Sequence, residues 1–524
     1  MEAVLRGRPT SGLRETLRDV LERRRRTDAP WLYFYRGAQA EALSFAQAGE
    51  LADGWARALK AAGVKGGDRV ALLFSNSPDF LGAFFGAQLI GATAVPLPWP
   101  VVASAGVQLP KGAEGILKVA QVSALCAPGP VSGVDVPVVT KPLMTSLDVS
   151  GDSPRAAFIQ FTSGSTGSPR GAIISQRAAV TSATMMGEGL GLTPSDVGVS
   201  WLPFFHDMGL VGVLLSSLAA GFPVHLLQPG DFLLHPSRWL ELLSSARATL
   251  AVAPNFAYEL VLRRAGPRGP IDLKPLRAML NGSEPVLRST ISAFEAKHAA
   301  LGLRKGAILP VYGLAENVLG VAFQSDGAPD ADLPHEGRQI PSTGVPLPGM
   351  TVAIRRADGT NAAQGEDGEI CVQGDAVMDG YLGDDAATAR ALRDGWLWTG
   401  DRGIIAGDRL YVTGREKELI IKAGRKYHPA DIERLVAEVA DTPPNGVAAF
   451  SVLDEATRGE ALVVVVEQRR RSTDDLVARI RGRIADELGV MADRIELVGA
   501  GELPRTTSGK LRRGECIARY GVRT

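Results

Sequence analysis

Cysteine is scarce in this sequence, with three residues among 524. Cys126, Cys371 and Cys516 stand far apart, and no two of them have the C-x-x-C spacing of a zinc or redox site. Neither a disulfide framework nor a zinc site is indicated, and a chain without disulfide bonds is typical of a reducing compartment. We therefore expect the protein to be cytoplasmic.

Net charge is lacking as well, because Lys plus Arg and Asp plus Glu both total 57. A balanced chain has no general electrostatic attraction to nucleic acid, so we expect no nucleic-acid partner. A local run of arginines at 23–26 follows a helix-like segment. A solvated helix end explains this run better than a binding site for an anion.

Long hydrophobic runs are also missing. The most apolar segment, FLGAFFGAQLIGATAVPLP (80–98), is interrupted by glycines and ends in prolines. It predicts a buried helix followed by a buried strand, not a membrane span. The first thirty residues are charged and lack the apolar centre of a signal peptide, so we expect neither a leader nor a membrane-spanning protein.

What the sequence does have is alternation of strand-like and helix-like segments. RVALLF (69–74) predicts a strand, SPDFLGAFFGAQLIG (77–91) a helix and ATAVPLP (92–98) the next strand. Such alternation is typical of mostly parallel sheets covered by helices. At this length one core is not enough, so two or more domains are expected. The predicted fold class is α/β.

The character of the chain changes near Gly414. GEICVQGDAVMDGYLG (368–383) and DRLYVT (408–413) predict a β-rich subdomain, whereas the segments from 428 onward predict a compact α/β unit. Pro429 suits the first turn of a helix there. We predict a large N-terminal domain at 1–413, a hinge at 414–418 and a small mobile C-terminal domain at 419–524.

The segment FTSGSTGSPRG (161–171) concentrates glycine, serine and threonine ahead of a single arginine. Glycine lets the backbone approach an anion, and hydroxyls add hydrogen bonds to its oxygens, so a phosphate-binding loop is predicted. Because AAFIQF precedes the loop and AIIS follows it, we expect it to join two strands. It is not a Walker motif, because such a motif needs Gly-Lys-Ser/Thr after the four-residue spacer that follows its first glycine, and the loop lacks this sequence.

This loop resembles the nucleotide-phosphate loop of the adenylate-forming superfamily, which includes acyl-CoA synthetases, luciferases and nonribosomal-peptide adenylation domains. Further segments match the superfamily's motifs in its order along the chain: NGSEPV (281–286), VYGLAEN (311–317), WLWTGD (396–401), VTGREKELIIKAGRKYHPADIE (412–433) and LPRTTSGKLRR (503–513). The resemblance implies an enzyme that uses ATP and Mg²⁺ to activate a carboxylic acid as its adenylate.

The resemblance implies nucleotide contacts along these motifs. The residues that correspond to the phosphate cradle are Thr162, Ser163, Gly164, Ser165, Thr166 and Gly167. Arg170 replaces the usual lysine, and either a phosphate contact or a solvated arginine is consistent with it. The residues that correspond to the adenine-binding segments are Gly282, Ser283, Glu284, Pro285, Tyr312, Gly313, Leu314 and Ala315. Tyr312 corresponds to the ring that stacks on adenine, with core packing as the alternative.

Three carboxylate and guanidinium groups complete the implied nucleotide site. Glu316 corresponds to the magnesium ligand, and a carboxylate oxygen suits a cation that bridges phosphates. Asp401 corresponds to the acceptor for the ribose hydroxyls, and Arg415 to a second ribose or phosphate contact. For these last two the alternative is a surface salt bridge.

The resemblance also implies a catalytic lysine and a pivot. Lys510 corresponds to the lysine that the small domain brings to the substrate carboxylate and the α-phosphate, where a cation offsets the charge that develops in the transition state. Lys417 corresponds to the hinge residue between the adenylating pose and the thiol-transferring pose.

SWLPFFHDMGLVG (200–212) resembles fatty acyl-AMP ligases, the branch that passes acyl adenylates to carrier proteins. His206 is accordingly expected near the acyl carboxylate, with a buried core histidine as the alternative. Gly209, Leu210, Val213 and Leu214 either line an acyl tunnel or pack in the core. The implied substrate is a medium- or long-chain fatty acid, and the implied partner is an acyl carrier protein or a polyketide or peptide synthase.

Two features differ from fatty acyl-AMP ligases, so the sequence does not decide which thiol accepts the acyl group. Fatty acyl-AMP ligases usually carry a long insertion after the Tyr-Gly motif, whereas residues 324–342 here are short and are predicted to form a loop. Gly424 is shared with acyl-CoA synthetases, so CoA is an alternative acceptor. A catalytically inactive nucleotide-binding relative is the contrasting hypothesis. The intact Glu316, Asp401 and Lys510 argue against it.

Overall fold

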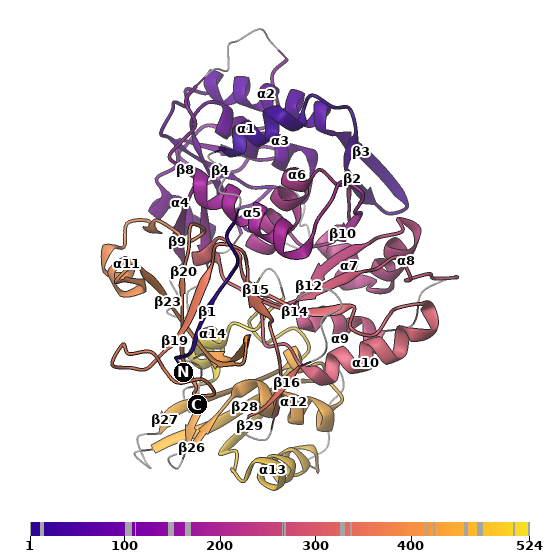
Figure 1. Ribbon diagram of the computed structural model, residues 1–524, viewed down its shortest axis with the longest axis vertical. Helices are drawn as coiled ribbons and strands as arrows, with labels where there is room; N and C mark the ends of the chain where they lie inside the picture. The colour runs from indigo at the N-terminus through magenta and orange to yellow at the C-terminus, as the bar shows by residue number, and fades with distance from the viewer. Residues whose placement is uncertain are drawn as a thin grey trace.

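The computed structural model describes residues 2–10, 15–99, 107–110, 112–144, 151–162, 169–264, 266, 269–324, 331–335, 338–415, 418, 420–422, 425–454, 459–468, 475–506 and 509–521. Its strands form two large sheets, a smaller β-rich sheet and a separate C-terminal sheet, and helices cover the large sheets (Figure 1). This arrangement confirms the predicted α/β class.

The larger sheet has nine strands and is mostly parallel. In spatial order these strands are β18 (Val345–Pro346), β15 (Gly320–Phe323), β14 (Ile308–Gly313), β13 (Ala278–Asn281), β12 (Leu250–Ala253), β10 (Gly198–Ser200), β11 (Val224–Leu226), β2 (Pro30–Arg36) and β3 (Gln39–Ser44). The run from β14 to β2 is parallel throughout, as alternation with helices predicts.

The second large sheet has seven strands. Its spatial order is β21 (Gly380–Tyr381), β9 (Arg170–Ser175), β8 (Ala156–Thr162), β5 (Thr93–Pro96), β4 (Arg69–Leu72), β6 (Ala124–Cys126) and β7 (Val138–Val139). β8 and β9 are antiparallel neighbours, so the predicted phosphate loop joins two strands as expected.

The helices of this region are α1 (Leu17–Arg24), α2 (Phe45–Ala61), α3 (Pro78–Leu89), α4 (Ala113–Ala120), α5 (Gln176–Leu190), the π-helix η1 (Met208–Leu215), α6 (Ser216–Ala220), α7 (Pro229–Leu234), α8 (Ser237–Ser245), α9 (Asn255–Arg263), α10 (Arg288–His298), and the short 3₁₀-helices η2 (Ala299–Leu301) and η3 (Ala315–Asn317).

The apolar segment at 80–98 forms the buried helix α3 and strand β5, as predicted. Phe84 packs on Phe158 of one large sheet with ring centroids 6.0 Å apart, and Phe80 packs on Phe204 beside the other at 5.4 Å. A helix between two sheets must be apolar all round, which explains its composition. No helix in the described part of the chain is long and apolar enough to cross a membrane.

The arginines at 23–26 differ from the predicted solvated helix end. Arg24 donates from Nε to the carbonyl of Leu218 at 2.9 Å, and the Arg25 guanidinium pairs with Asp53 at 2.6 Å. The carbonyls at the end of α6 attract Arg24, because the last turn of a helix leaves carbonyl groups without partners. These two side chains therefore join elements of the fold.

A third sheet is antiparallel and includes the N-terminal strand, which crosses to it in Figure 1. Its strands are β1 (Val4–Arg6), β19 (Thr351–Arg355), β20 (Gly368–Gln373), β23 (Trp396–Ala406), β22 (Leu392–Arg393) and β24 (Arg409–Arg415), with helix α11 (Asp385–Ala391) beside it. This sheet is the predicted β-rich subdomain.

The segment after the Tyr-Gly motif is not wholly a loop, so that prediction is wrong in part. β16 (Asp332–His335) and β17 (Arg338–Pro341) form an antiparallel hairpin. Ile340 is buried against Ile404 and Tyr411 of the β-rich sheet, and this burial stabilises a hairpin that its prolines obscured in the sequence.

The C-terminal part has its own sheets, helices and core. Its elements are β25 (Ile420–Lys422), β26 (Arg425–Tyr427), α12 (Pro429–Ala440), the 3₁₀-helix η5 (Pro444–Gly446), β27 (Val447–Asp454), β28 (Gly459–Gln468), α13 (Asp475–Leu488), β29 (Arg494–Gly499) and α14 (Arg513–Tyr520). Ile432, Val436 and Ile480 belong to a cluster of buried side chains within this part. Pro429 opens α12 as predicted.

Candidate active site

The site is built on the carboxyl ends of the parallel strands of the nine-stranded sheet. β10, β12, β13 and β14 run in the same direction, so the segments that follow them emerge at one edge. In open α/β sheets this edge is where ligands bind. It brings together the predicted residues at 206, 282–285 and 312–316.

The NGSEPV segment after β13 is held tightly. Asn281 is fully buried and donates to Asn255 Oδ1 at 3.1 Å, and the backbone N–H of Phe256 donates to Glu284 Oε1 at 2.5 Å. A Cβ at Gly282 would lie 2.7 Å from the Val311 carbonyl oxygen, so only glycine fits beside β14. Ser283 has a φ of 72°, a strained backbone position of the kind that clusters at functional sites.

Tyr312, Asp401 and Arg415 form one hydrogen-bonded group. The Tyr312 hydroxyl donates to Asp401 Oδ2 at 2.8 Å, and Arg415 Nε donates to Asp401 Oδ1 at 2.8 Å. Asp401 and Arg415 face each other across β23 and β24. Burial and the Asp401 carboxylate raise the pKa of Tyr312, so its hydroxyl stays protonated and donates.

Glu316 lies on η3, just after the Tyr-Gly motif, and is held at two points. The Tyr381 hydroxyl donates to its carboxylate Oε1 at 2.8 Å, and the Met378 N–H donates to its backbone carbonyl at 2.8 Å. Tyr381 belongs to β21 of the seven-stranded sheet. The predicted magnesium ligand is therefore tied to the sheet that carries the phosphate loop.

The residues at the two ends of the predicted phosphate loop are paired across neighbouring strands. Thr162 ends β8 and lies opposite Arg170, which begins β9. The Arg170 guanidinium lies 5.7 Å from the centre of the Tyr381 ring, and its Nε lies 3.8 Å from Asp384 Oδ2. The Arg170 side chain is therefore partly exposed and lies between Tyr381 and Asp384, so both alternatives for it stay predictions. The predicted cradle residues Ser163, Gly164, Ser165, Thr166 and Gly167 lie outside the described residues, as does the predicted hinge residue Lys417.

Lys510 reaches the NGSEPV segment from the C-terminal part of the chain. Its ammonium group hydrogen-bonds to Ser283 Oγ of the NGSEPV segment. The preceding Gly509 has a φ of 88°, and a Cβ there would lie 2.9 Å from the Phe256 ring, so glycine allows the close approach. Burial lowers the pKa of Lys510, while the carboxylates of Asp207 and Glu284 oppose that effect.

His206 and Asp207 follow β10 at the same edge. His206 Nδ1 lies 2.5 Å from Asp207 Oδ1. Burial alone would raise the pKa of Asp207, but His206 and Lys510 outweigh it and the pKa is lowered, so the carboxylate is charged. The histidine is half-buried beside a charged network, which favours a site residue over a core histidine.

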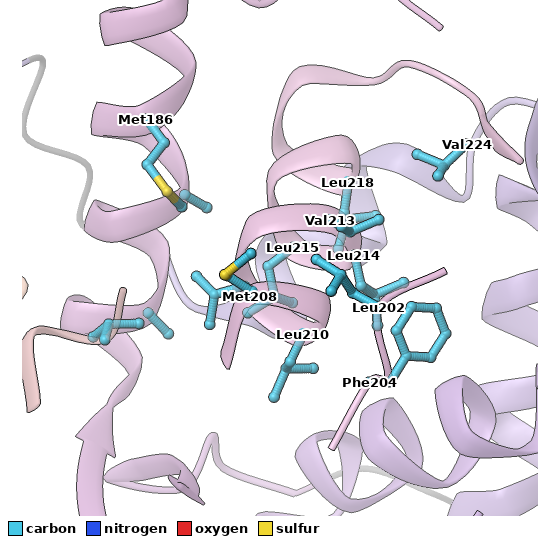
Figure 2. Close-up of a cluster of buried hydrophobic side chains, with 14 of the residues drawn as sticks. Met186, Leu202, Phe204, Met208, Leu210, Val213, Leu214, Leu215, Leu218 and Val224 are labelled. Atoms are coloured by element: carbon cyan, nitrogen blue, oxygen red, sulfur yellow. The ribbon is translucent and has the colours of Figure 1, made fainter. Parts of the chain in front are cut away.

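The π-helix η1 begins directly after this pair. Leu210, Val213 and Leu214 belong to a cluster of buried apolar side chains that also includes Leu202, Phe204 and Met208 (Figure 2). π-helical turns are rare and are frequently found at functional sites. The packing in this structure agrees with the core-packing alternative for these residues.

Comparisons with known proteins agree with this geometry. The family model of AMP-binding enzymes matches residues 21–382, and the AMP domain of Disco-interacting protein 2-like proteins matches residues 417–524. The chain belongs to the AMP-binding, adenylate-forming enzymes.

Its relatives include both an acyl-CoA synthetase and a ligase for acyl carrier protein. A putative acyl-CoA synthetase of Caulobacter vibrioides is 32% identical, over 93% of this chain and 92% of its own. The medium-chain-fatty-acid–[acyl-carrier-protein] ligase JamA of Moorena producens is 30% identical, over 86% of both chains. A solved structure from studies of fatty acyl-adenylate ligases of E. coli and L. pneumophila is 31% identical, with a TM-score of 0.86 over 98% of both chains. This AMP-binding enzyme is thus an adenylate-forming ligase similar to fatty acyl-AMP ligases.

The described part of this AMP-binding enzyme has no group of three or more His, Cys, Asp or Glu side chains that could hold a metal ion. Mg²⁺ commonly binds through one or two carboxylates together with substrate phosphates, and it keeps several waters. A single carboxylate, fixed through Oε1 by Tyr381 as Glu316 is, fits that pattern.

Sequence reasoning missed Tyr381 and Asp207 as parts of the site. Tyr381 stands in a glycine-rich strand segment, and an isolated tyrosine gives no signal of the carboxylate it meets 65 residues away in sequence. Asp207 follows His206 directly, and this pairing of an acid with a histidine was the signal that could have identified it.

Proposed function

We propose that this enzyme uses ATP to convert a medium- or long-chain fatty acid to its acyl adenylate, and then passes the acyl group to the phosphopantetheine thiol of a carrier protein. The observation that carries this proposal is the contact between Lys510 and Ser283. It supports a role for the small domain's cation beside His206, Asp207 and the nucleotide motifs.

In this proposal the nucleotide lies across the meeting point of the three sheets. Tyr312 stacks on adenine together with the segments at 282–285 and 313–315, and Asp401 with Arg415 holds the ribose hydroxyls. The phosphate loop at 162–167 and Arg170 hold the β- and γ-phosphates. The close grouping of Tyr312, Asp401 and Arg415 supports the ribose assignment, because a diol needs a fixed acceptor.

Adenylation then joins two anions. A carboxylate oxygen of the acid attacks the α-phosphorus, the bond to the bridging oxygen breaks, and pyrophosphate leaves. In this proposal the charge of Lys510 offsets the negative charge that develops on the phosphoryl oxygens. His206, with Asp207 at 2.5 Å, orients the acyl carboxylate.

We assign Glu316 as the protein ligand of Mg²⁺. When bound, the ion would neutralise phosphate charge and assist the departure of pyrophosphate. Glu316 contributes a carboxylate that Tyr381 holds in place. The remaining ligands would come from ATP and water, as the chemistry of the ion favours.

The domain assignment belongs to the same proposal. The large domain spans 1–413, the hinge 414–418 with Lys417 as its pivot, and the small domain 419–524. A separate core in the C-terminal part supports an independent small domain. After adenylation this domain would swing Lys510 away and admit the thiol, which attacks the acyl carbonyl and releases AMP.

The acceptor is assigned to a carrier protein, or to a polyketide or peptide synthase that contains one. Similarity to JamA, whose name specifies an acyl carrier protein, supports this choice. Similarity to a putative acyl-CoA synthetase supports CoA as the second candidate.

The experiment is fatty-acid-dependent exchange of labelled pyrophosphate into ATP, with acids of increasing chain length. We expect exchange with medium or long chains and none without acid. Absence of exchange with every acid would overturn the proposal and favour an inactive nucleotide-binding relative. Preformed acyl adenylate is then offered to holo carrier protein and to CoA side by side, and faster acyl-CoA formation would favour the second candidate.

A further inference from the structure

We propose that Tyr381 is a positioning residue that sets the Glu316 carboxylate for Mg²⁺ and, through its ring, seats Arg170 beside the phosphate loop. This inference rests on the proposed function, because it takes Glu316 as the metal ligand. Tyr381 touches neither the acid nor the reacting atoms in the proposal and acts through these two side chains.

Tyr381 is itself held rigidly. Its strand β21 pairs with β9, with Tyr381 opposite Ala172, two residues beyond Arg170. Its backbone N–H donates to Thr388 Oγ1 at 2.8 Å. At the preceding Gly380 the φ is 148°, and a Cβ would lie 2.8 Å from Thr388 Cγ2, so a larger residue could not sit here. A side chain on so fixed a backbone has few positions open to it.

Glu316 needs such support because its own element is short. η3 has three residues, and the chain leaves it at Val318 with a φ of 57°. The backbone of Glu316 is held by the Met378 N–H and its carboxylate by Tyr381, so the segment 378–381 fixes both ends of the residue. A metal-binding carboxylate held by an outer hydrogen bond binds its ion more tightly than a free one.

The ring of Tyr381 has a second contact. The Arg170 guanidinium lies over it at 5.7 Å from the ring centre, within the range of a cation–π interaction. Asp384 Oδ2 also lies 3.8 Å from the Nε of this arginine. Arg170 begins β9 at one end of the predicted phosphate loop, so one tyrosine contacts both the proposed metal ligand and an arginine at the end of that loop.

The hydroxyl and the ring of Tyr381 make separate contacts, the hydroxyl with the Glu316 carboxylate and the ring with the Arg170 guanidinium. Removing the hydroxyl alone tests the carboxylate contact, and removing the ring as well tests the arginine contact.

The experiment measures binding of α,β-methylene-ATP by calorimetry, without acyl acid, over a range of Mg²⁺ concentrations and in EDTA. We expect Tyr381→Phe to raise the Mg²⁺ concentration needed for half-maximal tightening roughly tenfold, the lower end of the effect of losing such a bond. Binding in EDTA should be unchanged. Tyr381→Leu should additionally weaken binding in EDTA by about two- to fivefold, the size of a lost cation–π contact.

The matched control is Tyr35→Phe, which removes a hydroxyl bonded to His225 Nδ1 at 2.9 Å, on strands at the far end of the nine-stranded sheet. It should leave both titrations unchanged. In a Glu316→Gln background the Tyr381→Phe change should have no further effect on Mg²⁺ dependence, because the group it positions has been removed.

Three results would overturn the inference. Tyr381→Phe could weaken binding of the analogue equally with and without Mg²⁺, which would mean a general structural role. Tyr381→Phe could leave the Mg²⁺ concentration for half-maximal tightening unchanged, or the wild type could bind the analogue equally well at every Mg²⁺ concentration. Failure of the proposed function is a separate result. A wild-type enzyme could bind the analogue in a Mg²⁺-dependent way and yet show no pyrophosphate exchange with any fatty acid. That outcome would contradict the proposed function and would leave the role of Tyr381 supported.

Discussion

The Tyr312 hydroxyl donates to Asp401 Oδ2 at 2.8 Å, and this bond joins the nine-stranded sheet to the β-rich sheet across 89 residues of sequence. Tyr312 is the last residue but one of β14, and Asp401 lies within β23 opposite Arg415. Because both oxygens of Asp401 have a donor, the carboxylate cannot rotate freely. A fixed carboxylate at the junction of two sheets is suited to recognise a ribose.

The first prediction tests that recognition. Asp401→Asn should weaken ATP binding roughly tenfold or more, because a hydrogen bond to a charged group contributes about 1.5–3 kcal/mol. It should also remove the preference for ATP over 2′,3′-dideoxy-ATP that we expect of the wild type. Calorimetric titration of both nucleotides gives the comparison. A variant that keeps the wild-type preference would assign Asp401 to a structural salt bridge.

The second prediction concerns Lys510. Lys510→Ala should reduce adenylate formation about a hundred- to a thousandfold, the usual effect of removing one preorganised group that stabilises transition-state charge. ATP binding should change little, because most nucleotide contacts are expected from the large domain. Single-turnover adenylate formation and ATP calorimetry separate the two effects. A rate above about a tenth of wild type would contradict the assigned role.

The third prediction is a pH dependence. Burial lowers the pKa of Lys510, so the ammonium loses its proton below the ordinary lysine value of about 10.4. Adenylation should therefore be active below this lowered pKa and should fall as the pH rises through it. In Lys510→Arg the remaining activity should show no such fall, because arginine keeps its charge. Pyrophosphate exchange measured from neutral to alkaline pH checks this. The same fall in both enzymes would assign it to another group.

Much of the fold could be predicted because the signals are local. The apolar segment at 80–98, interrupted by glycine, became α3 and β5, and Pro429 opened its helix as its fixed φ requires. The residues predicted to contact adenine and ribose come from the family resemblance, which assigns each of them through a short motif. The structure brings three of them, Tyr312, Asp401 and Arg415, into one hydrogen-bonded group.

The parts that could not be predicted depend on contacts between distant segments. Tyr381 meets Glu316 only because β21 pairs with β9, and a two-residue strand has no periodicity to detect. The hairpin at 332–341 is stabilised by burial of Ile340 on another sheet, which its own prolines do not reveal. The sequence predicted that Arg24 and Arg25 are solvated, because their partners, the Leu218 carbonyl and Asp53, are not neighbours in sequence.

The last prediction tests the domain boundary through Arg513. This side chain lies at 2.7 Å from Glu433 Oε2 and 2.8 Å from Glu418 Oε2, so it ties α14 to α12 and to the segment before β25. Glu433 is buried, and removal of its partner leaves a charge without compensation, at a cost of about 3–5 kcal/mol. If residues 419–524 fold as a unit, calorimetric unfolding should show two transitions, and Arg513→Ala should lower only one of them.

The neighbouring Arg512 supplies the control for that prediction. Its guanidinium pairs with Glu515, and both side chains are well exposed, so Arg512→Ala should change the free energy of unfolding by less than about 1 kcal/mol. Pyrophosphate exchange should fall in Arg513→Ala as the small domain unfolds on warming, before the large domain does. If Arg513→Ala shifts both transitions equally, the two parts unfold as one cooperative unit, and 414–418 is not the boundary between independently stable domains.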